Sequence, residues 1–597
     1  MAHRIELGPW FPLVVLVLSA TACMGKIGAH GPGSEGSPTT GSLCAGGAAL
    51  PLAEPAPLRR LSRLQYVKSL SDVIQDWAPS VASQILTTPA VTSALATLPE
   101  DSRVTGNGDR RGGFRRLDQD YAQDRVDAQF AIAQAVAAEL TSSPARIAAL
   151  LGSCASDADT TNDAACLDTF LRRGGRVVNR RPLDEDDVTF YQSVYAAKGI
   201  DAAGLADVVA TMLMSPYFTF QVEHGDVAVD ASQNLYALDA QELANRLSMQ
   251  FWGTGPDATL LAMADSGAIL DDTGFAQALD YVRNSPRMAD GLSEFFREYL
   301  SLEDLDEMNH LNGTPRWDAL RGSFTPTGDT RENMIDEVTR LASYYATKPD
   351  GTFSDLFTTR KSFATTDDVA QIYGVAKWAG TGEPPDIADP DRVGLITHAA
   401  LVATGAALTR PIIKGVVLRS VLLCDSLGQP PADAMMVAQE AQATVDPLSS
   451  TRTMTEALTE HRSDCSGCHL TGINPLGFPT EMFDPLGRKR QMESVFDDAG
   501  KMLGQVPLDT TSVPQVTSSD MAMVSNPGEL QTRMLASNRL QSCMARKYFR
   551  FTFGKLEQST DECTIQTISD ALTEGKPLGE VLVDLAKTPA FRQRRFN

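Results

Sequence analysis

Histidine and cysteine are scarce in this chain, which has 7 histidines and 9 cysteines among 597 residues. The sequence contains no HExxH pair for a catalytic zinc, no GxSxG nucleophile elbow and no glycine-rich P-loop. These absences exclude metalloproteases of the HExxH type, hydrolases built on that elbow and P-loop nucleotide hydrolases.

Positive charge is also in short supply. The chain carries 52 Lys and Arg against 75 Asp and Glu, for a net charge of −23. Nucleic acids and anionic lipid headgroups are bound mainly through basic side chains, so this balance argues against both as partners. An acidic surface suits a cationic partner protein instead. Hydrophobic residues make up 43% of the chain, which is ample for folded domains.

The most informative motif is the pentapeptide Cys-Ser-Gly-Cys-His, which runs from Cys465 through Cys468 to His469. It has the pattern of a c-type haem attachment site: both thiols bond to the porphyrin and the adjacent histidine ligates the iron. Composition alone would produce about 0.002 such pentapeptides in a chain of this length. A disulfide, half of a zinc site or a thioredoxin-like redox motif are the alternatives. The chain has no second CxxCH, so the sequence predicts one haem.

Residues 1–22 have the pattern of an export signal, because Arg4 precedes a short apolar run that ends in small residues before Cys23. This pattern resembles a bacterial lipobox and predicts lipidation of Cys23. The alternative is a secreted protein that is cleaved nearby. Met24, rather than Asp, follows the cysteine and favours the outer membrane. Residues 23–57 are rich in Gly, Pro and Ser and form the predicted flexible tether. No later segment is long and apolar enough to cross a membrane.

The other six cysteines are even in number, which fits disulfides in an oxidising compartment. Pairing of Cys154 with Cys166 and of Cys543 with Cys563 would close two short loops. Elimination then pairs Cys44 with Cys424, although a buried thiol is an equally good interpretation of Cys424.

Three- and four-residue spacing of apolar side chains predicts helices nearly throughout the chain. Examples are residues 58–77, a helix capped by Asp239, and a helical pair over 393–407 and 412–427. Residues 502–508 are predicted to form an arm of a short hairpin. The fold class is therefore mainly α. The predicted units are N-terminal helical modules at 58–230, a central helical module at 231–375, a haem c module at 388–510 and a C-terminal helical module at 515–597.

Several motifs in order resemble the planctomycete-type cytochrome c multi-module proteins, a group of exported haem proteins built largely from domains of unknown function. The motifs are Leu58–Tyr66, Phe170–Arg173 with Asn179–Leu183, Glu242–Ser248, Arg392–Thr397, the haem pentapeptide, Asn474–Phe478, Phe483–Arg488 and Cys543–Tyr548. The resemblance implies an exported electron-transfer protein of helical modules in tandem, with a cytochrome-c-like module near the C-terminus. In some members it also implies a link with polysaccharide breakdown. Met482 departs from the family pattern, in which Asn or His is expected.

Two Pro- and Gly-containing tetrapeptides, Asn474–Gly477 and Asp484–Gly487, are predicted to be tight turns that fold the chain over the porphyrin. A backbone carbonyl at or near Pro475 is expected to accept the hydrogen bond from the second ring nitrogen of His469. The first candidate for the sixth iron ligand is Met482 and the second is His461. Ordinary core packing is the alternative for Met482.

The remaining histidine in an apolar segment, His398, is predicted to be a core residue with satisfied hydrogen bonds. The predicted function is single-electron transfer at the cell envelope by a lipid-anchored, single-haem c-type cytochrome with an unidentified redox partner protein. Two alternatives stay open. One is a five-coordinate haem with peroxidase- or oxidase-like activity. The other is a polysaccharide-binding surface over residues 58–375 with an accessory haem.

Overall fold

The computed structural model describes residues 58–101, 114–115, 117, 121–195, 199–428, 445–461 and 463–596, and isolated positions between 430 and 438. Cys23 and Cys44 lie outside these residues, as do the predicted signal peptide, lipidation site and tether. The described chain is mainly helical with few strands, which confirms the predicted fold class.

The helices and strands are named in chain order in four groups: N-terminal, central, haem and C-terminal. Those of the N-terminal group are β1 (Arg59–Arg60), α1 (Arg63–Trp77), α2 (Ala82–Leu86), α3 (Pro89–Ala96), α4 (Gln123–Leu140), α5 (Pro144–Leu151), α6 (Asp163–Asn179), α7 (Glu185–Val194), α8 (Ala202–Leu213), α9 (Pro216–Thr219) and β2 (Phe220–Gln221). Those of the central group are β3 (Ala228–Asp230), β4 (Leu235–Ala237), α10 (Ala240–Phe251), α11 (Ala258–Asp265), α12 (Asp272–Asn284), α13 (Met288–Tyr299), α14 (Pro315–Arg321), α15 (Thr330–Thr347), α16 (Asp355–Thr358) and α17 (Asp367–Tyr373).

The last two groups contain the pentapeptide and the C-terminus. Those of the haem segment are α18 (Ala399–Val402), α19 (Pro411–Val417), the π-helix η6 (Leu418–Leu422), α21 (Thr451–Thr459), α22 (Ser463–Cys468), the π-helix η7 (His469–Ile473), α23 (Asn474–Gly477), the 3₁₀ turn η8 (Phe478–Met482), β5 (Met492–Phe496) and β6 (Met502–Pro507). Those of the C-terminal group are α24 (Pro527–Ala536), α25 (Arg539–Phe553), α26 (Glu562–Thr573), α27 (Leu578–Asp584), α28 (Pro589–Arg592) and β7 (Gln593–Arg595).

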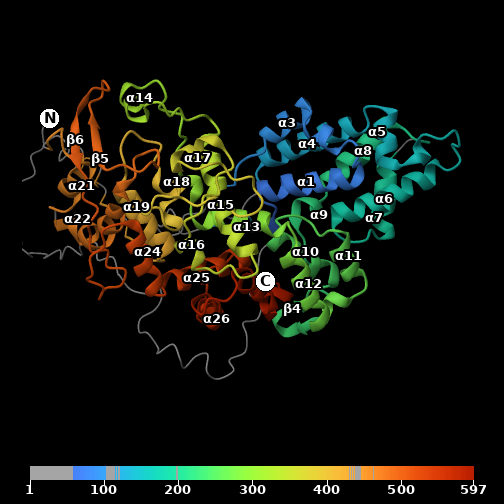
Figure 1. The fold of residues 1–597 in the computed structure, drawn as a ribbon. Helices are drawn as coiled ribbons and strands as arrows, with labels where there is room; N and C mark the ends of the chain where they lie inside the picture. Colours follow the sequence, from blue (N-terminus) through green and yellow to red (C-terminus); the bar gives the residue numbers. More distant parts are fainter. Residues whose placement is uncertain are drawn as a thin grey trace, which may run out of the picture.

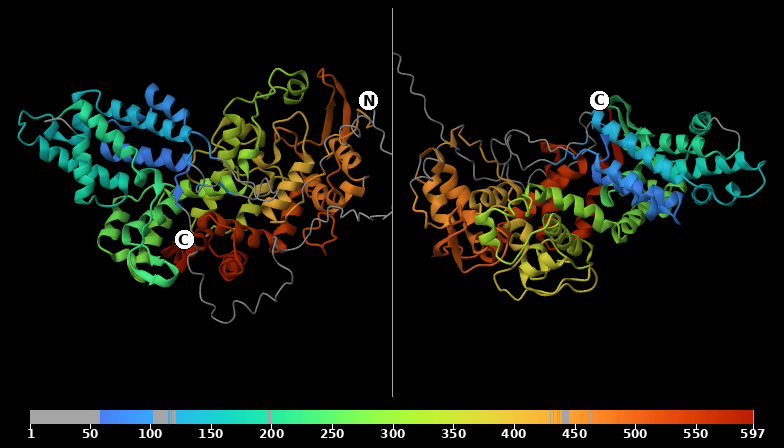
Figure 2. Two further views of the ribbon diagram at one scale, coloured as in Figure 1. Left: turned by 180° about the vertical axis from the view of Figure 1, so that it is seen from behind. Right: turned by 90° about the horizontal axis from the view of Figure 1, so that it is seen from above.

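The molecule is elongated, with the N-terminal helices at one end and the haem segment at the other (Figure 1). Helices α13, α15 and α25 lie between these ends, and the views from behind and above show the same order (Figure 2). The N-terminal helices enclose one hydrophobic core. A second core is continuous from Leu238 to Phe591, so the central, haem and C-terminal groups pack together as one body.

The first predicted helix forms as α1, which begins at Arg63. Ser62 caps it: its side chain accepts from the backbone of Gln65, whose side chain accepts from the backbone of Ser62 in return. The predicted apolar face, Tyr66, Leu70, Val73, Ile74 and Trp77, is fully buried. The helix capped by Asp239 also forms, as α10, with the same reciprocal bonding between Asp239 and Glu242.

Strands tie distant parts of the chain together. β1 pairs with β2 in antiparallel fashion, and Arg59 lies opposite Gln221. β7, at the end of the chain, returns to pair with β4, so that Leu235 lies opposite Arg595. The predicted hairpin is present as β5 and β6.

The predicted helix over 393–407 is wrong: only a 3₁₀ turn (Leu395–Thr397) and the short α18 form there. Gly394 has a φ of +68° and donates its N–H to the Thr359 carbonyl in the central group. The Thr404 N–H likewise bonds to the Pro485 carbonyl. Tertiary hydrogen bonds therefore replace the helical bonds. The second predicted helix ends earlier than expected, as α19 and η6 stop at Leu422.

Of the predicted disulfides, the pairing of Cys154 with Cys166 is confirmed. The other two pairings are wrong, because Cys424 is bonded to Cys543. The end of η6 packs against α25, which brings these two cysteines together across 119 residues of sequence. Cys563 is also disulfide-bonded, and its partner is not Cys543.

Candidate haem site

The pentapeptide lies on a helical turn, as its spacing predicts. Cys465 and Cys468 belong to α22 and are half-buried. His469 is the first residue of η7, so the two sulfurs and the imidazole follow one another along one continuous helical segment. A disulfide was one alternative interpretation of the motif, and the structure does not form one between Cys465 and Cys468.

Asn474 holds the imidazole of His469. The Nδ1 atom of His469 lies 3.1 Å from Oδ1 of Asn474, whose side chain is fully buried. The predicted backbone acceptor at or near Pro475 is not used, because Nδ1 of His469 bonds to Asn474 instead. The Pro475 carbonyl accepts from the hydroxyl of Ser512 at 2.6 Å. A side-chain amide therefore takes the place of a backbone carbonyl in orienting the ring.

The surrounding network establishes which nitrogen of His469 carries the proton. Nδ2 of Asn474 donates to Oγ1 of Thr459 at 2.9 Å and to Oε1 of Glu460 at 2.8 Å. The Thr459 hydroxyl donates in turn to the Thr455 carbonyl at 2.7 Å. Since both amide hydrogens of Asn474 are used, its oxygen faces His469 and must accept. Nδ1 is then protonated, and Nε2 has the lone pair that a metal needs.

The protonation state of His469 suits a ligand. Burial lowers the pKa of its imidazole below the ordinary value, and this effect exceeds the opposing influence of Asn474 and Glu460. The neutral ring is therefore the stable form at neutral pH, and neutral imidazole is the form that binds a metal.

Two glycines let the helix α19 lie directly against the haem segment. A Cβ atom on Gly415 would be 2.0 Å from the Ile473 carbonyl oxygen, and one on Gly477 would be 2.0 Å from the Pro411 carbonyl oxygen. No side chain larger than hydrogen fits at either position. The predicted turn over Asn474–Gly477 is wrong, because these residues continue η7 as the helical turn α23. The turn predicted at Asp484–Gly487 is present, with the Gly487 N–H donating to the Asp484 carbonyl.

The two candidates for the sixth ligand differ in their surroundings. Met482 ends η8 and is 9% exposed, and it packs with Val402 and Phe483 in a small cluster separate from the two large cores. His461 is exposed, just beyond the end of α21. Met482 remains the first prediction for the sixth ligand because its side chain is held in place by packing. The same packing is what its alternative interpretation, an ordinary core residue, requires.

A buried polar network connects this segment with the central group. Nδ1 of His398 lies 2.9 and 3.0 Å from the two carboxylate oxygens of Glu337, and the Tyr373 hydroxyl donates to the same carboxylate at 3.0 Å. His398 is therefore a core histidine with its hydrogen bonds made, as predicted. The Arg392 guanidinium lies 4.8 Å from the Tyr373 ring centroid and 4.5 Å from that of Phe483, next to Met482.

The donor set fits haem c: two thiols one helical turn apart and an adjacent neutral imidazole with a fixed ring and an available Nε2. Among the described residues, no three His, Cys, Asp or Glu side chains gather as another metal-binding group. Within the same residues, no helix has the length and apolar character of a membrane span.

These features define a mainly α, multi-module protein with a cytochrome-c-like module. Four family models, each described as a protein of unknown function, match in tandem: DUF1595 over residues 166–223, DUF1592 over 238–375, DUF1588 over 392–493 and DUF1585 over 522–591. The DUF1588 model, named PSCyt3, spans the pentapeptide and Met482. The chain belongs to the planctomycete-type cytochrome c multi-module proteins. No curated protein and no solved structure shows a significant match.

Proposed function

We propose that this protein is a single-haem c-type cytochrome that transfers electrons at the cell envelope. The observation that carries the proposal is the CxxCH segment on a helical turn, inside the PSCyt3 match, with the His469 ring held by Asn474. When bound, the haem supplies an iron that alternates between two oxidation states. Cys465 and Cys468 would hold the haem through covalent bonds to their sulfurs, and His469 would bind its iron through Nε2.

The surrounding residues restrict movement of the His469 imidazole. Asn474 is anchored by Thr459 and Glu460, and α19 lies in close contact with η7 and α23. A ligand that stays in place when the iron changes oxidation state lowers the reorganisation that accompanies electron transfer. An electron carrier therefore requires rigid surroundings for its ligands. Met482, as a second protein ligand, would fix the iron from the other side.

The haem itself is tested by extraction. Thioether bonds survive treatment with acid and acetone, whereas a non-covalent haem is removed. We expect the purified full-length protein to retain its haem, and the double variant Cys465→Ser, Cys468→Ser to lose it. Complete loss of haem from the unmutated protein would contradict covalent attachment. The pentapeptide would then be interpreted as a thiol redox motif or a metal site.

The export signal suggests where the carrier works. We propose lipidation at Cys23 and an outer-membrane location, periplasmic or at the cell surface, supported by the lipobox-like pattern and by Met24 after the cysteine. Cys23→Ala should move the protein from the detergent phase to the aqueous phase. Aqueous partitioning of the unmutated protein would count against the lipid anchor.

A further inference from the structure

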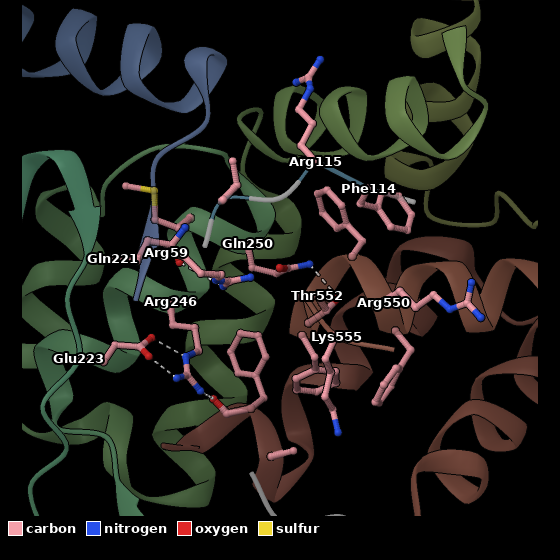
Figure 3. Close-up of a pocket in the computed structure, with 18 of the residues that line it drawn as sticks. Arg59, Phe114, Arg115, Gln221, Glu223, Arg246, Gln250, Arg550, Thr552 and Lys555 are labelled. Atoms are coloured by element: carbon pink, nitrogen blue, oxygen red, sulfur yellow. Dashed lines mark hydrogen bonds and ion pairs between the residues drawn. The ribbon is translucent and has the colours of Figure 1, made fainter. Parts of the chain in front are cut away.

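A cavity far from the pentapeptide lies where the N-terminal, central and C-terminal groups meet (Figure 3). The space that water-sized molecules can enter is about 140 Å³, and the cavity is partly open to solvent. β1, β2, α10, α13, the end of α25 and β7 form its walls. No described residue of 392–493 lines it, so this cavity is separate from the haem site.

The walls are positively charged although the chain as a whole is acidic. Seven basic and four acidic side chains line the cavity, in a chain of net charge −23. Arg115 and Arg550 point away from the space in Figure 3, and Arg550 is paired with Glu557, outside the lining. Without Arg115 and Arg550, five basic and four acidic side chains of the lining remain. A concentration of positive charge here favours an anion.

One wall shows the effect of this charge on a carboxylate. Glu223 is buried, and Arg246 holds it with two hydrogen bonds, from Nε at 2.7 Å and from Nη2 at 2.5 Å. Arg594 donates to the same carboxylate at 3.1 Å. Burial alone would raise the pKa of Glu223, but Arg246, Arg594 and Arg59 outweigh burial and lower it. The wall therefore stabilises a negative charge that is removed from water.

Two further basic residues, Arg59 and Lys555, border the cavity near the end of α25. Gly554 adopts the left-handed conformation, with a φ of +63°, and ends the helix just before Lys555. A Cβ on Gly554 would lie 3.3 Å from Nη1 of Arg59, so glycine lets the arginine approach the helix end. Arg59 donates to the neutral amide of Gln221 at 3.2 Å, and Lys555 bonds to Asp561 at 3.0 Å. Two cations from opposite ends of the sequence thus border the same space.

Aromatic rings form the apolar part of the lining. Phe549 and Phe553 face each other at a centroid distance of 4.8 Å, and Phe591 lies on the neighbouring wall. We propose that the cavity binds a small organic anion with a flat apolar body, whose anionic group is attracted by the basic side chains of the lining, Arg59 and Lys555 among them, and whose body packs against these phenylalanines. Because the three module groups all contribute walls, such a ligand would also hold them together.

The matched probes are naphthalene-1-sulfonate, which is anionic, and naphthalene-1-sulfonamide, which is neutral. Binding to the full-length protein is measured by titration calorimetry at low salt. The sulfonate should bind at one saturable site, and Lys555→Gln or Arg59→Gln should weaken its binding about tenfold, since each removes a positive charge from the lining. The neutral probe should be affected less than about twofold by either change. Phe553→Ala should weaken both probes.

Two controls separate the site from general effects. Lys501→Gln removes an exposed positive charge in the β5–β6 turn and should leave both affinities unchanged. Lys555→Arg keeps the charge and should retain binding, which guards against a loss of fold in the other variants. Absence of saturable sulfonate binding, or equal binding by Lys555→Gln, Arg59→Gln and the unmutated protein, would overturn the proposal. Haem absorption should be the same in all these variants, so failure of this proposal leaves the proposed cytochrome function intact.

Discussion

Around His469, a side-chain acceptor rather than a backbone carbonyl determines the electronic character of the imidazole. Asn474 accepts from Nδ1, while its own amide donates to the Glu460 carboxylate at 2.8 Å. The negative charge of Glu460 polarises the amide and strengthens its carbonyl as an acceptor. A stronger bond at Nδ1 would make the ring a better donor to the iron of a bound haem and would stabilise its ferric state.

Replacing Asn474 by Leu should therefore raise the reduction potential. If the lost bond is worth about 1.4 kcal/mol more in the ferric state, the rise is roughly 60 mV for a one-electron couple. Spectroelectrochemical titration measures it. Thr459→Val is the matched control, because it removes one anchor of the amide but keeps the acceptor, and it should shift the potential by less than half as much. Equal potentials for Asn474→Leu and the unmutated protein would show that the hydrogen bond only positions the ring.

Replacing Met482 by Ala tests the second axial position. If Met482 is the ligand, the variant should have a lower potential and its ferrous form should bind carbon monoxide, because thioether sulfur favours ferrous iron and its removal opens the site. Met544→Ala is the control: it truncates a fully buried methionine in α25 and should destabilise the fold without opening the iron.

The outcomes of the Met482 experiment also separate a carrier from an enzyme. Ready carbon monoxide binding and fast reaction with peroxide by the unmutated protein would favour the peroxidase- or oxidase-like alternative. If only His461→Ala opens the iron to carbon monoxide, the carrier function stands, and His461 rather than Met482 is the second iron ligand. If none of these variants differs from the unmutated protein, Met482 serves only in packing with Val402 and Phe483.

The residue types of the site could be predicted from the sequence more readily than their partners. The pentapeptide is local, so its spacing alone places both thiols and the imidazole on one helical turn. The Asn474 contact depends on where Thr459 and Glu460 lie after folding, and no spacing rule predicts it. The cysteine pairing failed for the same reason, since Cys424 meets Cys543 only when η6 packs against α25.

Among the elements, the contact between α19 and the haem segment depends on glycine. Gly415→Ala would place a methyl group 2.0 Å from the Ile473 carbonyl oxygen, and backbone on both sides would have to move. We expect a destabilisation of about 1–3 kcal/mol, the usual cost of overpacking, measured by thermal or denaturant unfolding. The absorption spectrum of the haem should shift as well, because η7 begins with His469.

Gly472→Ala is the matched control for this substitution. Gly472 lies in η7, the π-helix that Gly415 packs against. Outside its own helix it has no atom within 4 Å of its ideal Cβ position, and it does not have a positive φ. Its replacement should change stability by no more than about 0.5 kcal/mol. Equal stability of the two variants would show that the helices adjust and that the close approach is not required.

Element boundaries show where sequence periodicity is sufficient. α1 and α10 form as expected because a cap and an apolar face lie within each segment. The apolar run over 393–407 has a similar composition but is divided by hydrogen bonds to Thr359 and Pro485, residues far away in the sequence. Local pattern predicts helices whose bonds are internal, and it fails where the backbone bonds to other parts of the chain.

At the scale of the whole molecule, the tandem order of the modules does not produce separate bodies. One core extends from Leu238 to Phe591, and the final strand β7 pairs with β4 of the central group. The haem segment is therefore fixed to a large helical body, which supports it on one side and leaves the opposite end of the elongated molecule to the N-terminal helices (Figure 1). The sequence could order the modules but could not show that their cores merge, because that depends on contacts between them.

The net charge of −23 leads to a prediction about partners. Charged reactants are steered by the field of the whole protein, and salt screens this field over about 10 Å at 0.1 M ionic strength. Oxidation of the reduced protein by the cation hexaammineruthenium(III) should slow as salt is added, whereas oxidation by the anion hexacyanoferrate(III) should become faster. Stopped-flow kinetics between about 10 and 200 mM salt would span this screening range. If the two oxidation rates change with salt in the opposite directions, a basic patch dominates near the haem and the redox partner protein is acidic. The expected salt dependence of the two rates would instead favour a cationic partner that docks at the haem end of the molecule.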